Sequence, residues 1–181
     1  MNDNGSGVAT VLEAAVQLRR LGARPERGIR FAFWAAEELG LLGSRAYAKG
    51  LEGPDELAGV LNFDMVGSPN FARFVYAGDG RIESAFESWF RDHDLAVEEI
   101  ELEGRSDHAP FEALGIPVGG LFTGADEPKT AAEAKLFGGQ AGVAHDPCYH
   151  QACDTLANVN RRVLGQMADA AAAVALVLAG P

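Results

Sequence analysis

The stretch IRFAFWA at residues 29–35 is apolar or aromatic at nearly every position. The stretch LNFDMV at residues 61–66 has a similar composition. Such runs are typical of strands covered on both faces, so we expect both segments in the centre of a parallel sheet. Glu37 and Glu38 follow the first run, and Asp64 follows Phe63 in the second. Open α/β sheets place their sites at these carboxyl ends.

Elsewhere the hydrophobic period alternates between that of helices and that of strands. This alternation predicts an α/β layered domain. Gly22 provides a stop for the first helix, and the long, Gly-rich residues 123–142 are expected to form a functional loop. We expect helices at residues 8–18, 38–49, 82–90 and 164–178, and further strands at residues 97–102 and 118–122.

Length and charge restrict the possible partners. The 181 residues are 48% hydrophobic, which predicts one domain with a substantial core. With 15 Lys and Arg against 26 Asp and Glu, the formal charge of -11 argues against binding nucleic acid or an anionic membrane surface. We expect no membrane span, since no stretch approaches the roughly 18 to 20 apolar residues required, and residues 1–20 do not resemble a signal peptide.

Four carboxylates stand at positions typical of sites, although each has an ordinary structural interpretation. Asp3 alone is typical of a helix cap, Glu37 and Glu38 of an exposed helix start, and Asp64 of a turn. However, Asp64 lies inside a strongly apolar run, where an unpaired charge is costly, so it requires a cation. Together with His150, the carboxylates form a ligand set that suits Zn²⁺, with one carboxylate left as a base.

The two cysteines lie close together in CYHQAC, at Cys148 and Cys153. This spacing allows a disulfide, a reduced pair or two thiolate metal ligands, and we favour the disulfide because half the ligands of a zinc ribbon are missing. A disulfide implies an oxidising compartment. His150 alone is more typical of a structural or surface histidine, but a tight loop would fix its imidazole.

Five motifs stand in order along essentially the whole chain. They are DNGSG at residues 3–7, AEELGLLGS at 36–44, NFDM at 62–65, GRSDHAPF at 104–111 and CYH at 148–150. Together they resemble the secreted bacterial di-zinc aminopeptidases of peptidase family M28, most of all the Streptomyces-type leucine aminopeptidases. The resemblance implies a three-layer α/β/α zinc-exopeptidase (phosphorylase/hydrolase-like) fold with a mixed, mostly parallel central sheet, truncated at the N-terminus. Residues 1–181 would form the C-terminal two-thirds of that catalytic domain.

The resemblance also implies roles. Asp3 would bridge two zinc ions, Glu38 and His150 would complete one zinc site, and Asp64 would bind the other zinc ion. Glu37 would be the general base and Tyr149 the donor to the oxyanion. Three further residues would contact substrate, Arg105 near the free amino terminus and Met65 and Phe122 as walls for the first side chain.

Other residues carry weaker signals. We interpret Asp107 and His108 as structural, and His93 and His145 as surface residues. The glycosylation pattern at residues 4–6 is interpreted as a false positive, because the resemblance places it inside the site. Since Arg161 and Gly165 stand where some relatives are acidic, no calcium site is expected.

One departure from the family concerns the second zinc site. Family members carry, ahead of the DNGSG motif, the first strands of the sheet and a His-x-Asp segment whose His completes that site. We expect such a segment, preceded by a secretion signal, to be encoded upstream of Met1.

The function predicted from the sequence is a secreted, monomeric metalloaminopeptidase that removes apolar N-terminal residues from peptides, with two zinc ions in the full-length form. The alternatives are another exopeptidase or a cyclase on the same scaffold, or a non-catalytic remnant that binds metal or peptide.

Overall fold

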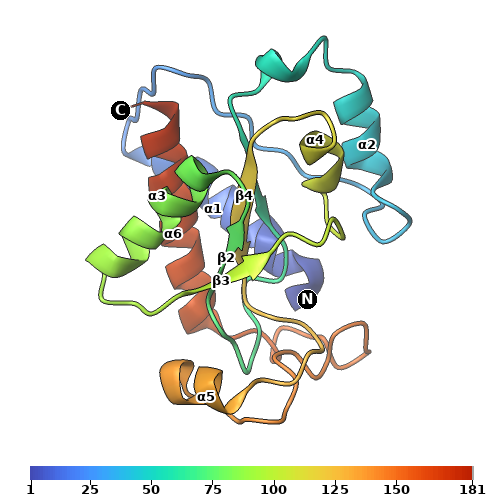
Figure 1. Ribbon diagram of the computed structural model, residues 1–181, viewed down its shortest axis with the longest axis vertical. Helices are drawn as coiled ribbons and strands as arrows, with labels where there is room; N and C mark the ends of the chain where they lie inside the picture. The colour runs from blue at the N-terminus through green and yellow to red at the C-terminus, as the bar shows by residue number, and fades with distance from the viewer. Residues whose placement is uncertain (181) are drawn as a thin grey trace.

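A computed structural model describes residues 1–180 and shows helices on both faces of a central four-stranded sheet (Figure 1). The strand order is β1-β4-β2-β3. The β1–β4 and β2–β3 pairs are parallel, and β2–β4 is antiparallel. The predicted fold class, three layers around a mixed, mostly parallel sheet, is therefore confirmed.

The described residues form helices and strands that alternate along much of the chain. In chain order they are η1 (Asn2–Ser6), α1 (Gly7–Arg20), α2 (Leu42–Lys49), η2 (Pro54–Glu56), β1 (Val60–Phe63), β2 (Phe74–Ala77), α3 (Gly80–Asp92), β3 (Glu98–Glu101), α4 (Ala109–Glu112), β4 (Val118–Phe122), α5 (Ala131–Phe137) and α6 (Arg161–Ala179).

Each face of the sheet has its own apolar core. On one face, Phe86 of α3 and Met167 of α6 are fully buried against Val75 and Leu121 of the sheet. On the other face, α2 and α4 pack over β1 and β4, with Phe111 at the centre of the cluster. This two-sided cover explains why the central strands are rich in apolar residues.

Most predicted elements are confirmed with small shifts at their ends. The helix predicted from residue 38 begins only at Leu42, because residues 37–41 form a turn in which Leu41 has a positive φ of 59°. Strand β2 was not predicted. Residues 123–142 are more than a loop, since they contain α5. A capping box between Thr130 and Glu133 stabilises the start of this helix.

The central strand expected at residues 29–35 is wrong for this structure. The segment is extended but pairs with no strand, and most of its residues are exposed. A strand exists only where a neighbouring backbone supplies hydrogen bonds, and β1, the nearest strand of the sheet, pairs only with β4.

Helix α6 is long and apolar enough to cross a membrane by length and composition alone. The core helix of a globular domain meets the same criteria. Val163, Met167 and Ala171 of α6 are buried in the domain, where the helix packs against α1 and α3.

Candidate metal-binding active site

All nine predicted site residues line one cavity of about 470 Å³ at the carboxyl ends of β1 and β4. Six different segments supply them, namely the turn before α1, the turn before α2, the residues that follow β1, the connection between β3 and α4, the last residue of β4, and the loop between α5 and α6. They are Asp3, Glu37, Glu38, Asp64, Met65, Arg105, Phe122, Tyr149 and His150.

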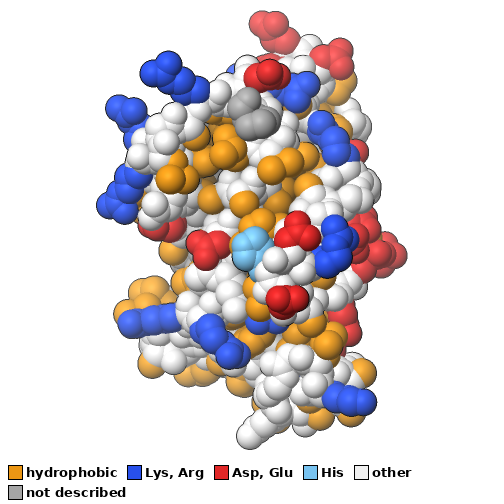
Figure 2. Space-filling view, turned by 90° about the vertical axis from the view of Figure 1, so that its left-hand side faces the viewer, with side chains coloured by type: hydrophobic (Ala, Val, Ile, Leu, Met, Phe, Trp, Pro, Cys, Tyr) orange, Lys and Arg blue, Asp and Glu red, His pale blue; other side chains and the backbone are white. Residues whose placement is uncertain are grey.

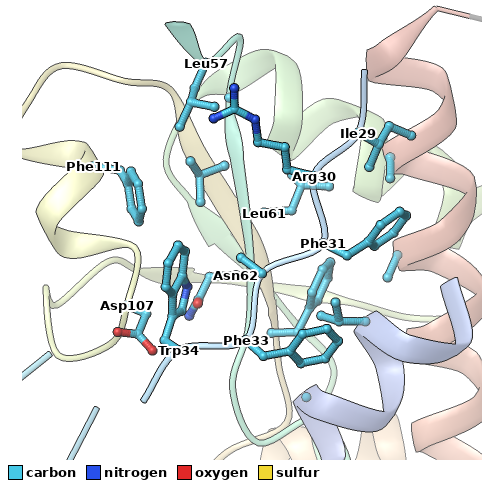
Figure 3. Close-up of a pocket in the computed structure, with 18 of the residues that line it drawn as sticks. Ile29, Arg30, Phe31, Phe33, Trp34, Leu57, Leu61, Asn62, Asp107 and Phe111 are labelled. Carbon is cyan, nitrogen blue, oxygen red and sulfur yellow. The ribbon is translucent and has the colours of Figure 1, made fainter. Parts of the chain in front are cut away.

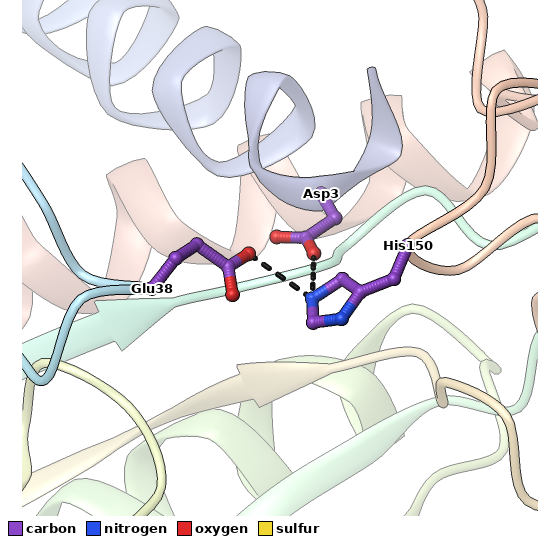
Figure 4. Close-up of side chains that lie close together, drawn as sticks. All are labelled: Asp3, Glu38 and His150. Atoms are coloured by element: carbon purple, nitrogen blue, oxygen red, sulfur yellow. Dashed lines mark hydrogen bonds and ion pairs between the residues drawn. The ribbon is translucent and has the colours of Figure 1, made fainter.

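The centre of the site is a triad of Asp3, Glu38 and His150 (Figure 4). Nε2 of His150 lies 3.1 Å from Oδ2 of Asp3 and 3.1 Å from Oε1 of Glu38. Tetrahedral Zn²⁺ with bonds of 2.0 to 2.2 Å separates its ligand atoms by roughly 3.3 Å. The side chains therefore stand close to the geometry in which they would bind one such ion.

The site concentrates negative charge. In residues 1–180 no Lys or Arg forms an ion pair with Asp3, Glu37, Glu38 or Asp64. Burial, followed by repulsion from Asp64 and Glu38, raises the pKa of Asp3 to about 7. The same causes raise the pKa of Glu37 to about 7. A divalent cation would relieve this repulsion, which is the electrostatic reason to expect one.

Asp64 faces the triad from the end of β1. Its Oδ2 accepts a 2.6 Å hydrogen bond from Oγ of Ser106, and Ser106 in turn accepts a bond from the Asn62 side chain. The second oxygen, Oδ1, is buried without a hydrogen-bond partner. Burial raises the pKa of this carboxyl group. An unpartnered buried carboxylate oxygen beside Asp3 fits the chemistry of a second cation.

A polar network that the sequence did not reveal holds Asp3 in place. The Asp154 carboxylate accepts hydrogen bonds from the backbone N–H groups of Asn2 and Asp3, at 2.8 and 3.1 Å. The fully buried Asn2 side chain donates to Ser68 and Asp146. The only local sign in the sequence that Asp154 supports the site is that it directly follows Cys153.

The loop that carries Tyr149 and His150 is closed by the predicted disulfide between Cys148 and Cys153, whose Cα atoms are 5.3 Å apart. His150 has a positive φ of 55°, and its ring stacks on that of Tyr149 with 3.9 Å between the centroids. The disulfide therefore restrains a loop in which two neighbouring rings both line the cavity.

The expected substrate walls differ in how firmly they are held. Met65 is 3% exposed, and the Phe122 ring stacks on that of Tyr76, which is also buried. Arg105 is exposed, and its guanidinium lies 3.6 Å from the Glu103 carboxylate. The apolar walls are therefore rigid, whereas the arginine can reorient.

The two histidines expected at the surface differ from each other in burial. His93 is exposed, as predicted. The surface position expected for His145 is wrong, because its ring is buried next to Glu133 and its Nδ1 lies 2.9 Å from the Glu127 carbonyl oxygen. His108 also lines the cavity, with both ring nitrogens buried and unpartnered.

Comparison with known proteins agrees with the fold and the site. Residues 1–175 match peptidase family M28, and the chain belongs to this family. It is 50% identical to leupeptin-inactivating enzyme 1 of Streptomyces exfoliatus over 175 residues, which are 95% of this chain and 40% of that enzyme. Leucine aminopeptidase 2 of Trichophyton rubrum is 43% identical over 175 residues, covering 89% of this chain and 35% of that protein.

Among solved structures, a zinc aminopeptidase from Bacillus subtilis superposes with a TM-score of 0.79 at 27% identity. The superposition covers 96% of this chain and 41% of that protein. The chain thus spans about 40% of the length of the Streptomyces exfoliatus relative.

Proposed function

We propose that the protein is a metalloaminopeptidase that hydrolyses the first peptide bond of peptides with an apolar N-terminal residue. The observation that carries the proposal is the triad of Asp3, Glu38 and His150, whose ligand atoms all lie within 4.8 Å of one another and which lines a cavity that Met65 and Phe122 also line. The family and the names of the relatives support the same activity.

The residues present fit one zinc site and part of a second. Asp3, Glu38 and His150 would hold the first ion, and Asp3 and Asp64 would contribute to the second. Zinc lowers the pKa of bound water and polarises the carbonyl group of the substrate.

Glu37 would act on the proton of the attacking water. It lines the cavity beside Glu38 but does not belong to the close triad, so its carboxylate is free to accept that proton and return it to the leaving amine. The Tyr149 hydroxyl is a donor within the same cavity, suited to the oxyanion of the tetrahedral intermediate.

We infer the substrate class from the side chains that line the cavity of the site. Met65 and Phe122 offer a firm apolar surface for the first side chain, and Arg105 contributes a polar group at the rim. The disulfide supports an extracellular location, so we infer that the substrates are extracellular peptides. A monomeric protein stays a prediction from the sequence.

Hydrolysis of Leu-p-nitroanilide, measured with zinc and after chelation, tests the proposal. We expect turnover that requires zinc, is lost with N-acetyl-Leu-p-nitroanilide because the free amine is blocked, and falls with Asp-p-nitroanilide. Zinc binding without any turnover would contradict the proposal and favour a non-catalytic remnant. Equal cleavage of the blocked substrate would indicate a different peptidase.

A further inference from the structure

The side chains of the triad lie at the surface, whereas groups that hold two of them in place are buried. Figure 2 shows a histidine side chain flanked by acidic side chains on one face of the molecule. The side chain of His150 is 49% exposed and that of Glu38 is 56% exposed. Open side chains of this kind can adopt several rotamers, so a metal site is ready only if the backbone that carries its ligands is fixed.

Asn2, which directly precedes the first ligand, is fully buried and uses its carboxamide in three hydrogen bonds. Its Nδ2 donates to Oδ2 of Asp146 at 2.7 Å and to Oγ of Ser68 at 3.0 Å. Its Oδ1 accepts a bond from the backbone N–H of Gly67 at 3.0 Å. Gly67 and Ser68 belong to the connection after β1 that begins with Asp64. One buried side chain thus ties the segment of the first ligand to two other parts of the site.

Asp146 is 1% exposed and lies at the start of the loop that carries His150. Its Oδ1 accepts hydrogen bonds from the backbone N–H of Cys148 and from Nδ2 of Asn158, both at 2.9 Å. Its Oδ2 accepts the bond from Asn2. A buried carboxylate is costly unless its oxygens are hydrogen-bonded, and here both oxygens bind donors that belong to different segments of the site.

We propose that Asn2 and Asp146 are a positioning pair that sets the separation of Asp3 and His150. Nothing local in the chain fixes this separation, since Asn2 and Asp146 are 144 positions apart. In the structure Oδ2 of Asp3 already lies 3.1 Å from Nε2 of His150, close to the spacing of two ligands on one zinc ion. This role rests on the proposed function, because it concerns the same zinc site, and it adds two residues that act through the ligands beside them.

The third ligand of the triad lies on a less enclosed segment. Glu38 follows the extended residues 28–34, which line a cavity of about 1500 Å³ and pair with no strand of the described chain (Figure 3). Two aromatic rings of this segment are partly open to solvent, with Phe31 38% exposed and Phe33 52% exposed. We therefore expect zinc binding to depend strongly on how well the other two ligands are fixed.

An exchange of the two side chains tests the pairing. In Asp146→Asn, an NH₂ group must face one of the three donors that the carboxylate accepts from, and in Asn2→Asp, two buried carboxylates face each other. We expect each single variant to bind zinc about 10- to 100-fold more weakly. The double variant Asn2→Asp, Asp146→Asn keeps the net charge and again places a donor opposite an acceptor. Its zinc affinity should return to within about threefold of the original.

Two measurements separate positioning from a general loss of stability. Competition with a chelator gives the zinc affinity, and urea unfolding of the metal-free proteins gives the stability. Gln166→Ala is the matched control, because it removes two hydrogen bonds from the buried Arg73 and neither residue lines the cavity of the site. This variant should lose stability and keep its zinc affinity.

Two results would contradict the positioning pair, namely a double variant that binds zinc as weakly as the single variants, or unstable single variants that bind zinc normally. If neither single variant folds, the double variant decides alone. Normal zinc binding then supports the pair, and weak binding or a failure to fold contradicts it. If the original protein binds zinc without hydrolysing Leu-p-nitroanilide, the proposed function fails, and the zinc affinities still test the pair.

Discussion

The hydroxyl of Ser106 donates a 2.6 Å hydrogen bond to Oδ2 of Asp64 and leaves Oδ1 of that carboxylate without a partner. Ser106 is buried, and it also accepts a hydrogen bond from Asn62, one residue before the end of β1. One oxygen of Asp64 is thus fixed by the fold, and the other is left for a ligand. Groups that orient a metal ligand in this way tune its affinity for the ion.

Replacement of Ser106 by Ala should therefore weaken zinc binding by about 10- to 100-fold, because Asp64 loses its orienting donor. A competitive chelator titration measures the change. Ser84→Ala, on the exposed side of α3, is the matched control and should bind zinc as the original protein does. An unchanged affinity in Ser106→Ala would show that Asp64 needs no orientation.

Gly7 marks the close approach of α1 to the end of β1. A Cβ atom at this position would lie 2.0 Å from the Phe63 carbonyl oxygen. This oxygen belongs to the backbone, so it cannot easily move away. Gly7→Ala should lower the free energy of unfolding by about 1 to 3 kcal/mol. Gly165→Ala should instead stabilise by about 1 kcal/mol, since nothing lies within 4 Å of its Cβ position in helix α6. Thermal unfolding of both variants checks the opposite signs.

His108 should make stability depend on pH. Burial lowers its pKa from 6.5 to about 4, so between these values the unfolded chain binds a proton that the folded protein does not. Stability contributed by the neutral ring is thus present above pH 6.5 and is lost as pH falls toward 4, by about 3 kcal/mol at most.

The variant His108→Gln isolates this contribution from the carboxylates, which titrate in both proteins. Denaturant unfolding from pH 7 to pH 4 should show a smaller loss of stability in this variant, whereas the exposed His93→Gln should behave as the original protein. Equal pH dependence in all three proteins would contradict the burial of a neutral His108.

The disulfide should contribute to stability and to the position of His150. Cys148 and Cys153 are five residues apart, and closing so small a loop is worth about 2 kcal/mol in the chain-entropy estimate. The double variant Cys148→Ser, Cys153→Ser should lose about this much in urea unfolding and should bind zinc less tightly. Free thiols in the natively folded protein would contradict the pairing.

The site was predictable because its chemistry is local in the sequence. Glu37 and Glu38, Asp64 and the CYH motif each belong to a short contiguous motif, and Asp64 directly follows β1, at the edge of the sheet where such sites lie. Ser106 and Asp154 were missed because their hydrogen-bond partners, Asp64 and Asp3, lie far away in the sequence.

The fold was predictable where an element carries its own pattern. Helices α1, α3 and α6 have clear apolar stripes, and the predicted strand at residues 118–122 coincides with β4. The error at residues 29–35 has a physical cause. The apolar composition of this segment suits a strand between two others, but composition cannot show whether neighbouring strands are present to pair with it. His145 was misplaced because its burial depends on Glu127 and Glu133, which belong to a segment expected to be a loop.

Zinc content and turnover, measured together in Glu37→Gln and Glu38→Gln, test the central claim most directly. If Glu38 is a ligand and Glu37 the base, Glu37→Gln keeps its zinc and loses about 10²- to 10⁴-fold in kcat, while Glu38→Gln binds zinc more weakly. Equal zinc binding and equal loss of activity in the two variants would contradict the division of roles between these neighbours.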